Sequence, residues 1–409
     1  MRRFLPAVLG ALAAWILWLA ITVPLALRIM RIDPIALAAP ATAPPPQFDP
    51  ARPTAAVLLS QAGTEITDFL APYAILAESG AFNVVAVAPT ADPVPTSGRL
   101  GVVPQQTFAA FDAAHPAGAA VIVIPNVLDP ENPAIGDWLR ARQSNGAVLA
   151  SICEGARVLA HHGFLDGHAA TTHFAALERL RAAHPRVRWQ ADRRYVDDGS
   201  VVSSAGITAG IDTALHLVTR FAGADVTARA AAALALPPPV DPSTPSPRLT
   251  PAILGTGVLN GAFDWPKTSV ALHLEDGIDE FAAAAVLDAY PRSFAAVASS
   301  VAPGRAPVVS RHGLLLVPIA EAAAVDADLA IVPNGSSDGV FAFDRVLADI
   351  ARRYDGATAR LSAAQLEYAA DRLPRDARRW RVQPYITLLA VLTAGAVAGH
   401  TIFARRRRS

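Results

Sequence analysis

Two long apolar segments near the ends of the chain place the strongest limit on its fold. Residues 4–27 carry no charged side chain, and a helix of that length is about 36 Å long, enough to cross a bilayer. Residues 385–404 form a second apolar run that only His400 interrupts. A cleaved signal peptide ending at Ala36-Leu37-Ala38 is the alternative for the first run. That run is longer than the roughly 7–15 apolar residues of a signal peptide, so we expect two transmembrane helices with the bulk of the chain on one side.

Arginines flank both apolar runs and leave the orientation open. Arg2, Arg3 and the arginines at 405–408 favour cytoplasmic termini, with the bulk of the chain outside the cytoplasm. A second group favours the reverse: Arg28, Arg31, Arg372, Arg375, Arg378, Arg379 and Arg381. We adopt the first orientation and expect a two-pass protein of a bacterial inner membrane.

The composition excludes several other classes of protein. Hydrophobic residues make up 52% of the chain and charged residues 17%, which excludes a disordered chain. Lys+Arg and Asp+Glu both number 35, and no helix-turn-helix or zinc-finger spacing occurs, so we expect no nucleic-acid partner. The single cysteine, Cys153, excludes an internal disulfide and a cysteine-cluster metal site.

Two proline-rich stretches, residues 39–53 and 237–251, divide the region between the apolar runs. Proline fixes φ and removes a backbone donor, so we expect an extended spacer and a linker. Residues 54–236 lie between them and alternate short apolar runs, typical of strands, with helical patterns. We expect strands over 55–60, 83–88, 120–124 and 147–151, and helices over 67–78, 132–143, 154–161, 174–184 and 207–221. This alternation predicts a doubly wound α/β domain with a parallel sheet covered on both faces.

Residues 268–370 are similar to residues 54–236 in four segments that occur in the same order. The pairs are 57–76 with 270–290, 82–89 with 293–300, 121–126 with 329–334, and 146–160 with 356–370. The last pair sets Ala363 against Cys153. Chance likeness of Ala/Val-rich strands is the alternative. We expect an internal duplication with a degenerate second α/β copy.

The segment GAVLASICEGARVLA, residues 146–160, carries the strongest signal for chemistry. The expected strand runs into Cys153 and a helix begins at once. Such a nucleophile elbow exposes its central side chain at the carboxyl end of the sheet, where ligand clefts form. The helix N-terminus favours a thiolate, so we expect Cys153 to be a nucleophile. A small buried apolar side chain is the alternative.

The residues around this elbow resemble those of the DJ-1/PfpI superfamily, which is glutamine amidotransferase-like. The pattern is Cys153, Ala-Thr-Thr-His at 170–173 and Gly-Ile-Thr-Ala-Gly-Ile-Asp at 206–212. It is most similar to the amidase-like domain of AraC-type regulators and to isocyanide hydratase. The resemblance covers residues 54–223, and 268–370 more loosely. It implies a flavodoxin-like sandwich, dimerisation, and an acid, Asp68, that reaches the cysteine.

The same resemblance implies two oxyanion donors, the backbone N–H groups of Glu154 and Asn126. Here the chain departs from the family, because Pro125-Asn126-Val127 replaces the usual Pro-Gly-Gly. Losing both glycines restricts the backbone and re-aims or removes a donor. We expect the Glu154 carboxylate to point outward in the first turn of the helix.

The remaining candidates are polar residues after the elbow. His173 is a second catalytic candidate, with a structural histidine beside Thr171 and Thr172 as the alternative. Thr172 and Gly206 are candidate binding residues, since N–H groups of the Gly206–Gly210 loop open a helix and suit an anion. No metal is expected, because four histidines lack ligand spacing: His161, His162, His168 and His184. No cofactor fingerprint occurs.

Two functions fit these observations. The first is a cysteine-dependent hydrolase or hydratase-type enzyme in which Cys153 attacks a small molecule and Asp68 moves the proton. The alternative is a sensing module that binds a small molecule or responds to redox conditions without catalysis. In either case we expect residues 268–370 to pack on the first domain as a pseudo-dimer partner.

Overall fold

The structure is a computed structural model that describes residues 4–35, 41–46, 48–245, 247, 249–333, 339–368, 373 and 381–406. Several sequence features lie outside these residues: Ala36-Leu37-Ala38, part of the 39–53 spacer, the arginines at 372, 375, 378 and 379, and the end of the 405–408 tail.

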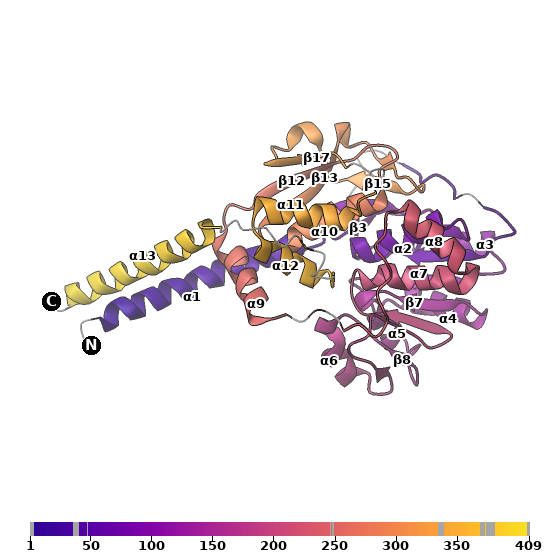
Figure 1. Ribbon diagram of the computed structural model, residues 1–409, viewed down its shortest axis with the longest axis horizontal. Coiled ribbons are helices and arrows are strands. Elements are labelled where there is room, and N and C mark those ends of the chain that lie inside the picture. The colour runs from indigo at the N-terminus through magenta and orange to yellow at the C-terminus, as the bar shows by residue number, and fades with distance from the viewer. Residues whose placement is uncertain are drawn as a thin grey trace.

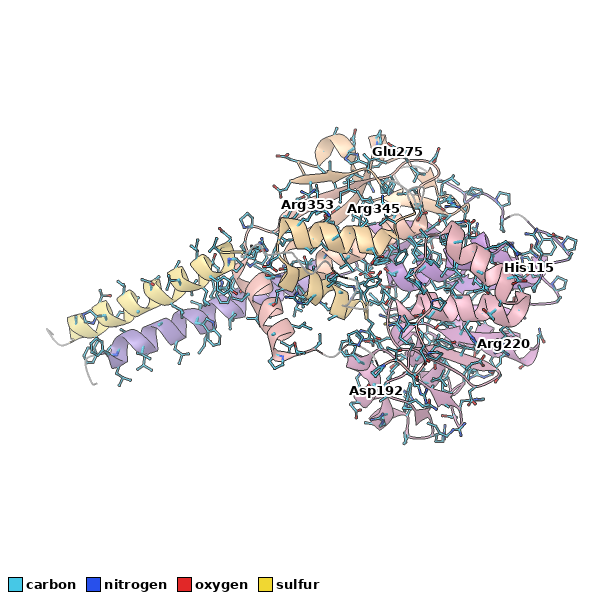
Figure 2. All side chains as sticks on the ribbon, in the orientation of Figure 1. His115, Asp192, Arg220, Glu275, Arg345 and Arg353 are labelled. Atoms are coloured by element: carbon cyan, nitrogen blue, oxygen red, sulfur yellow. The ribbon has the colours of Figure 1, made fainter. Side chains whose placement is uncertain are left out.

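Two helices, α1 (Leu5–Leu27) and α13 (Gln383–Arg406), run side by side away from the rest of the molecule (Figure 1). Both are long and apolar enough to cross a membrane, and their side chains point outward along the pair (Figure 2). The backbones touch at glycines, since a Cβ on Gly10 would lie 2.2 Å from the Gly395 carbonyl oxygen. A Cβ on Gly399 would lie 2.2 Å from the Pro6 carbonyl oxygen. Small residues therefore allow the close approach typical of membrane helices.

The first half contains a seven-stranded sheet in the order β10-β11-β7-β6-β1-β2-β5. All neighbours pair in parallel except β10 and β11. The strands are β1 (Thr54–Leu58), β2 (Asn83–Ala88), β5 (Gln106–Thr107), β6 (Val121–Ile124), β7 (Val148–Ser151), β10 (Tyr195–Asp197) and β11 (Val201–Ser204). Alternate side chains of β1 enter two cores, Ala55 and Val57 on one face and Ala56 and Leu58 on the other.

Helices cover both faces of this sheet, which confirms the predicted doubly wound α/β fold. On one face lie α2 (Ile66–Glu78) and α7 (Ala209–Ala222). On the other lie α3 (Phe108–Ala114), α4 (Pro133–Ser144) and α5 (Ala156–His161). The sequence did not predict β5, β10, β11 or α3, nor the elements β3 (Val94–Thr96), β4 (Leu100–Val103), β8 (Ala169–Ala170), β9 (Arg188–Trp189) and α8 (Ala224–Ala233).

The second half is a smaller α/β unit with the strand order β16-β13-β12-β17. Its strands are β12 (Thr268–His273), β13 (Ala296–Ala302), β16 (Ala320–Glu321) and β17 (Leu329–Ile331), with helices α10 (Glu280–Arg292), α11 (Ala342–Arg353) and α12 (Gly356–Gln365). The parallel order β13-β12-β17 repeats the order β2-β1-β6 of the first half. This agreement supports three of the four sequence matches, and the duplication itself stays a prediction.

The fourth match, 146–160 with 356–370, is wrong as a structural equivalence. The described part of that stretch forms α12, and Ala363 lies inside the helix rather than at an elbow. Asp355 caps the helix by accepting a hydrogen bond from the Thr358 N–H at 2.6 Å. An alanine-rich run after such a cap is a good helix former, so no strand arises there.

The two halves pack directly on one another. Helices α2 and α10 are buried along almost their whole length and share one hydrophobic core, which explains why most of their side chains are apolar. A four-stranded antiparallel sheet also joins the halves, because β15 (Leu315–Pro318) of the second half pairs with β4 of the first. One further apolar helix, α9 (Pro251–Val258), continues into a π-helical turn at Leu259–Phe263 beside α1 (Figure 1).

Candidate active site

Cys153 occupies a strained turn between β7 and α5. Its φ of +57° lies in the left-handed region, which costs a non-glycine residue roughly 1–3 kcal/mol. Its N–H donates to the Ser204 Oγ at 3.2 Å. A Cβ on Gly155 would lie 2.0 Å from the Ile124 carbonyl oxygen, so the turn needs glycine to press against the end of β6. The chain is therefore folded as an elbow, with the sulfur at the carboxyl end of the sheet.

Asp68 lies in the first turn of α2 and is fully buried. Its Oδ2 accepts a hydrogen bond from the Asn126 N–H at 3.2 Å, while Oδ1 makes no hydrogen bond within the described part of the chain. Glu65 caps the same helix, its Oε2 accepting from the Asp68 N–H at 2.6 Å. Burial raises the pKa of Asp68 to about 7, so this acid can hold or release a proton near neutral pH.

The Cys153 side chain is buried among charges, with 5% of the residue exposed. Burial raises the pKa of the thiol well above its usual value. The charges of Asp68, Glu65, Glu154 and Glu367, in that order, raise it further. The expected stabilisation of a thiolate by the helix N-terminus is therefore outweighed, and in this conformation the sulfur is protonated.

Arg292, at the end of α10, brings a positive charge from the second half into this cluster. Its Nη2 donates to Glu65 Oε1 at 3.1 Å, and its Nε donates to Asp288 Oδ1 at 2.6 Å. The Thr67 hydroxyl donates to the other Asp288 oxygen at 2.8 Å. A chain of buried polar contacts thus joins α2 to α10, and its charges act on the cysteine.

Glu367, just after α12, also enters the site from the second half. Its side chain is fully buried and its backbone is left-handed, with φ +53°. A Cβ on Gly206 would lie 2.1 Å from the Glu367 Cδ, so the carboxylate group occupies the space that this glycine leaves. The Phe174 N–H donates to Glu367 Oε1 at 3.5 Å. A carboxyl group of the chain itself therefore lies beside Gly206.

His173 caps α6 (Phe174–Ala183) rather than pairing with the sulfur. Its Nδ1 accepts a hydrogen bond from the Ala175 N–H at 3.3 Å, and its Nε2 lies 3.8 Å from Glu367 Oε1. Burial lowers the pKa of His173 to about 4, so the ring is neutral. Thr172 lies nearer the elbow, where its hydroxyl donates to the Cys153 carbonyl oxygen at 2.9 Å.

The two backbone donors suggested for an oxyanion differ in availability. The Asn126 N–H is already bound to Asp68, whereas the Glu154 N–H makes no hydrogen bond within the described residues. The Glu154 side chain turns away from the sulfur to ion pairs with Arg157 at 3.5 Å and Arg179 at 2.8 Å. One donor, rather than two, is free beside the elbow.

Sequence reasoning missed the residues that the second half contributes. Arg292 and Glu367 carry no motif, because their importance depends on packing against a distant segment. Glu65 had a weak signal, since it precedes Asp68 by three positions as a helix cap does. No cluster of three or more metal-ligating side chains occurs in the part of the chain that the structure describes.

The profile of the DJ-1/PfpI family matches residues 54–220. Isonitrile hydratase from Pseudomonas putida is 32% identical over 164 residues, which cover 39% of this chain and 68% of that protein. The HTH-type transcriptional regulator CdhR from Pseudomonas aeruginosa is 37% identical over 91 residues, 22% of this chain and 27% of the regulator. The crystal structure of Drosophila melanogaster DJ-1beta aligns with 46% of this chain and 100% of its own, with 24% identity and a TM-score of 0.42.

Proposed function

The chain belongs to the DJ-1/PfpI family, and from this membership we propose that it is a membrane-anchored enzyme that hydrates a small electrophilic molecule through Cys153. The helix pair α1 and α13 supplies the anchor. The observation that carries the proposal is the buried Asp68 carboxyl, whose pKa of about 7 suits a proton carrier beside an elbow thiol. A relative with 32% identity is an isonitrile hydratase, which makes an isocyanide the first substrate to test.

The proton carrier and the backbone donors at this site favour hydration over amide hydrolysis. Asp68 takes the thiol proton as sulfur bonds to the isocyanide carbon, and it then returns that proton to the same carbon. Water adds to the resulting thioimidate, the C–S bond breaks, and a formamide leaves with the thiol restored. Amide hydrolysis instead builds a full oxyanion, which pairs of N–H donors usually stabilise, and here Asn126 is already engaged by Asp68.

The test uses the full chain in detergent with an aryl isocyanide, and the formamide is measured by mass spectrometry. We expect Cys153→Ala to abolish turnover and Asp68→Asn to reduce it at least a hundredfold, because the proton carrier is lost. Asp166→Asn is the matched control, since that carboxylate pairs with exposed Arg186 on the surface. Turnover that survives Cys153→Ala would refute the proposal.

A sensing role is the second candidate, and the closed site favours it. Cys153 is 5% exposed, and Glu367 occupies the space beside Gly206 where a ligand's anionic group would bind. A sensor would bind isocyanide or an analogue saturably without producing formamide. The same assay, with binding measured alongside product, separates the two roles.

A further inference from the structure

A cavity of about 360 Å³ lies between the last turn of α1, helix α9 and the start of α6. Most of its wall is apolar, with Val23, Ala26 and Leu27 from α1 and Leu254, Gly257 and Val258 from α9. Three of these residues have large exposed fractions, Leu27 with 62%, Leu254 with 52% and Val258 with 49%. The cavity therefore opens among apolar side chains rather than among charged ones.

The segment that forms this wall lies against the apolar helix pair. Residues 251–263 form a short apolar helix, and the Trp18 indole N–H on α1 donates to the Ala262 carbonyl oxygen at 2.8 Å. When α1 crosses a bilayer, Val23 to Leu27 occupy its last turn and lie at the edge of the hydrocarbon region. The opening then faces the membrane, where apolar molecules are concentrated.

One part of the cavity wall is polar and adjoins the cysteine site. It consists of His173, Arg292 and Gln365. Arg292 is the residue that pairs with Glu65 and Asp288, so the cavity ends against the charged cluster around Cys153. Apolar and polar walls of this kind suit an amphiphile with its chain toward the membrane and its head toward the sulfur.

His173 indicates what the head group must offer. Its Nδ1 accepts from the Ala175 N–H and the ring is neutral, so the ring proton resides on Nε2. This shielded Nε2–H makes no hydrogen bond of good geometry within the described residues, where it faces only the Gln365 backbone carbonyl and Glu367 Oε1 at 3.8 Å. A buried donor held only in weak contacts is costly, and a ligand that supplies a well-placed acceptor reduces that cost.

The charges nearby disfavour a charged head group. The guanidinium of Arg292 is already shared by two carboxylates, and Glu367 lies 3.8 Å from His173 Nε2. A carboxylate ligand would meet these anions, and an ammonium ligand would meet Arg292. An uncharged acceptor avoids both and needs no ion partner when it is desolvated.

We infer that the cavity admits, from the bilayer, an uncharged amphiphile with one apolar chain and a small acceptor head that pairs with His173. The inference rests on the proposed function and narrows it, since it makes the substrate of Cys153 a lipophilic molecule rather than a water-soluble one. An alkyl isocyanide and its formamide product both meet this description.

The test measures binding to the full chain in lipid nanodiscs, by displacement of a solvatochromic dodecyl amide. N-dodecylformamide should displace it at least tenfold better than N-ethylformamide or dodecanoate. Gly257→Phe should weaken probe binding at least tenfold by filling the cavity. A Cβ at Gly257 makes only ordinary contacts, the nearest at 3.7 Å to Leu361, so this variant should fold. Gly255→Phe is the matched control on the same helix, because nothing lies within 4 Å of its Cβ.

The outcomes separate this inference from the proposed chemistry. Cys153→Ala should bind the probe like the wild type, and His173→Phe should bind it more weakly. Binding that persists in Gly257→Phe, or dodecanoate that competes as well as the formamide, overturns the inference even if isocyanide is hydrated. Chain-length-dependent binding without any formamide supports the cavity assignment and refutes the enzyme.

Discussion

Replacing Asp68 by asparagine tests whether carboxylate charge controls the reactivity of Cys153. After burial, Asp68 is the largest contributor to the raised thiol pKa. A like charge at such a site shifts a pKa by roughly one unit or more. Asparagine keeps an oxygen that can accept the Asn126 N–H, so Asp68→Asn removes the charge with little change in shape. We expect the thiol pKa to fall by about one unit, or ~1.4 kcal/mol.

The rate of alkylation follows from this shift. At a pH below the thiol pKa, a fall of one unit raises the thiolate fraction about tenfold, but a less basic thiolate reacts about threefold more slowly, which leaves a gain of roughly three- to fourfold. The gain depends on pH, because the Asp68 pKa is about 7. Above that pH the wild-type carboxylate is charged and repels the thiolate, whereas below it the protonated acid does not.

Iodoacetamide labelling measures this directly, because Cys153 is the single cysteine of the chain. The ratio of variant to wild-type rates should be near one at pH 6 and reach three to four at pH 8.5. Asp166→Asn, which changes a surface carboxylate, should give a ratio of one throughout. A slower Asp68→Asn, or a ratio that stays at one from pH 6 to 9, would show that this reasoning about the site is mistaken.

Three further predictions concern stability and packing. Gly155→Ala should destabilise the protein by about 2–4 kcal/mol, because its Cβ would lie 2.0 Å from the Ile124 carbonyl oxygen. Gly255→Ala is the control and should not destabilise it, because nothing lies within 4 Å of that Cβ. Thermal unfolding of both variants in detergent measures the difference. Gly10→Leu should separate α1 from α13, since its Cβ would lie 2.2 Å from the backbone of α13, and loss of energy transfer between dyes on the two helices would report it. Folding raises the Asp68 pKa from 3.8 to about 7, so its contribution to stability is present below pH 4 and is lost as pH rises to 7. The Asp68 contribution to the slope approaches ~1.4 kcal/mol per pH unit and should be lost in Asp68→Asn, which leaves the slope of the same sign from Glu65, whose pKa burial also raises. An unchanged pH dependence of the unfolding temperature counts against this prediction.

Local patterns in the sequence were sufficient for most of the fold. Continuous apolar runs predicted β1, β2, β6 and β7, and the helical periodicity between them predicted α2, α4, α6 and α7, since both signals depend on neighbouring residues. The same logic misled the comparison of 146–160 with 356–370. The alanine-rich segment 356–370 is similar in sequence to a segment that contains a strand, but the helix cap at Asp355 favours a helix there.

In the candidate site, too, some features could be predicted from the sequence and others depended on distant residues. The elbow at Cys153 comes from a short motif whose geometry is local, whereas the acid at Asp68 was indicated only by the resemblance to a known family. The protonation state of the sulfur was not accessible in that way, because it depends on which distant charges surround it after folding. The expectation of a thiolate considered the helix N-terminus and an outward Glu154, and it left out burial and the charges of Asp68, Glu65 and Glu367.

The sequence by itself determined two apolar helices, an α/β domain and a cysteine at a strand-to-helix turn, because each is encoded in contiguous residues. Only the tertiary structure decided that a second half completes the site. Glu65 and Arg292 are 227 positions apart, yet they form a buried ion pair. Coulomb energies depend on distance in space and on burial, and neither quantity exists until the two halves have packed together.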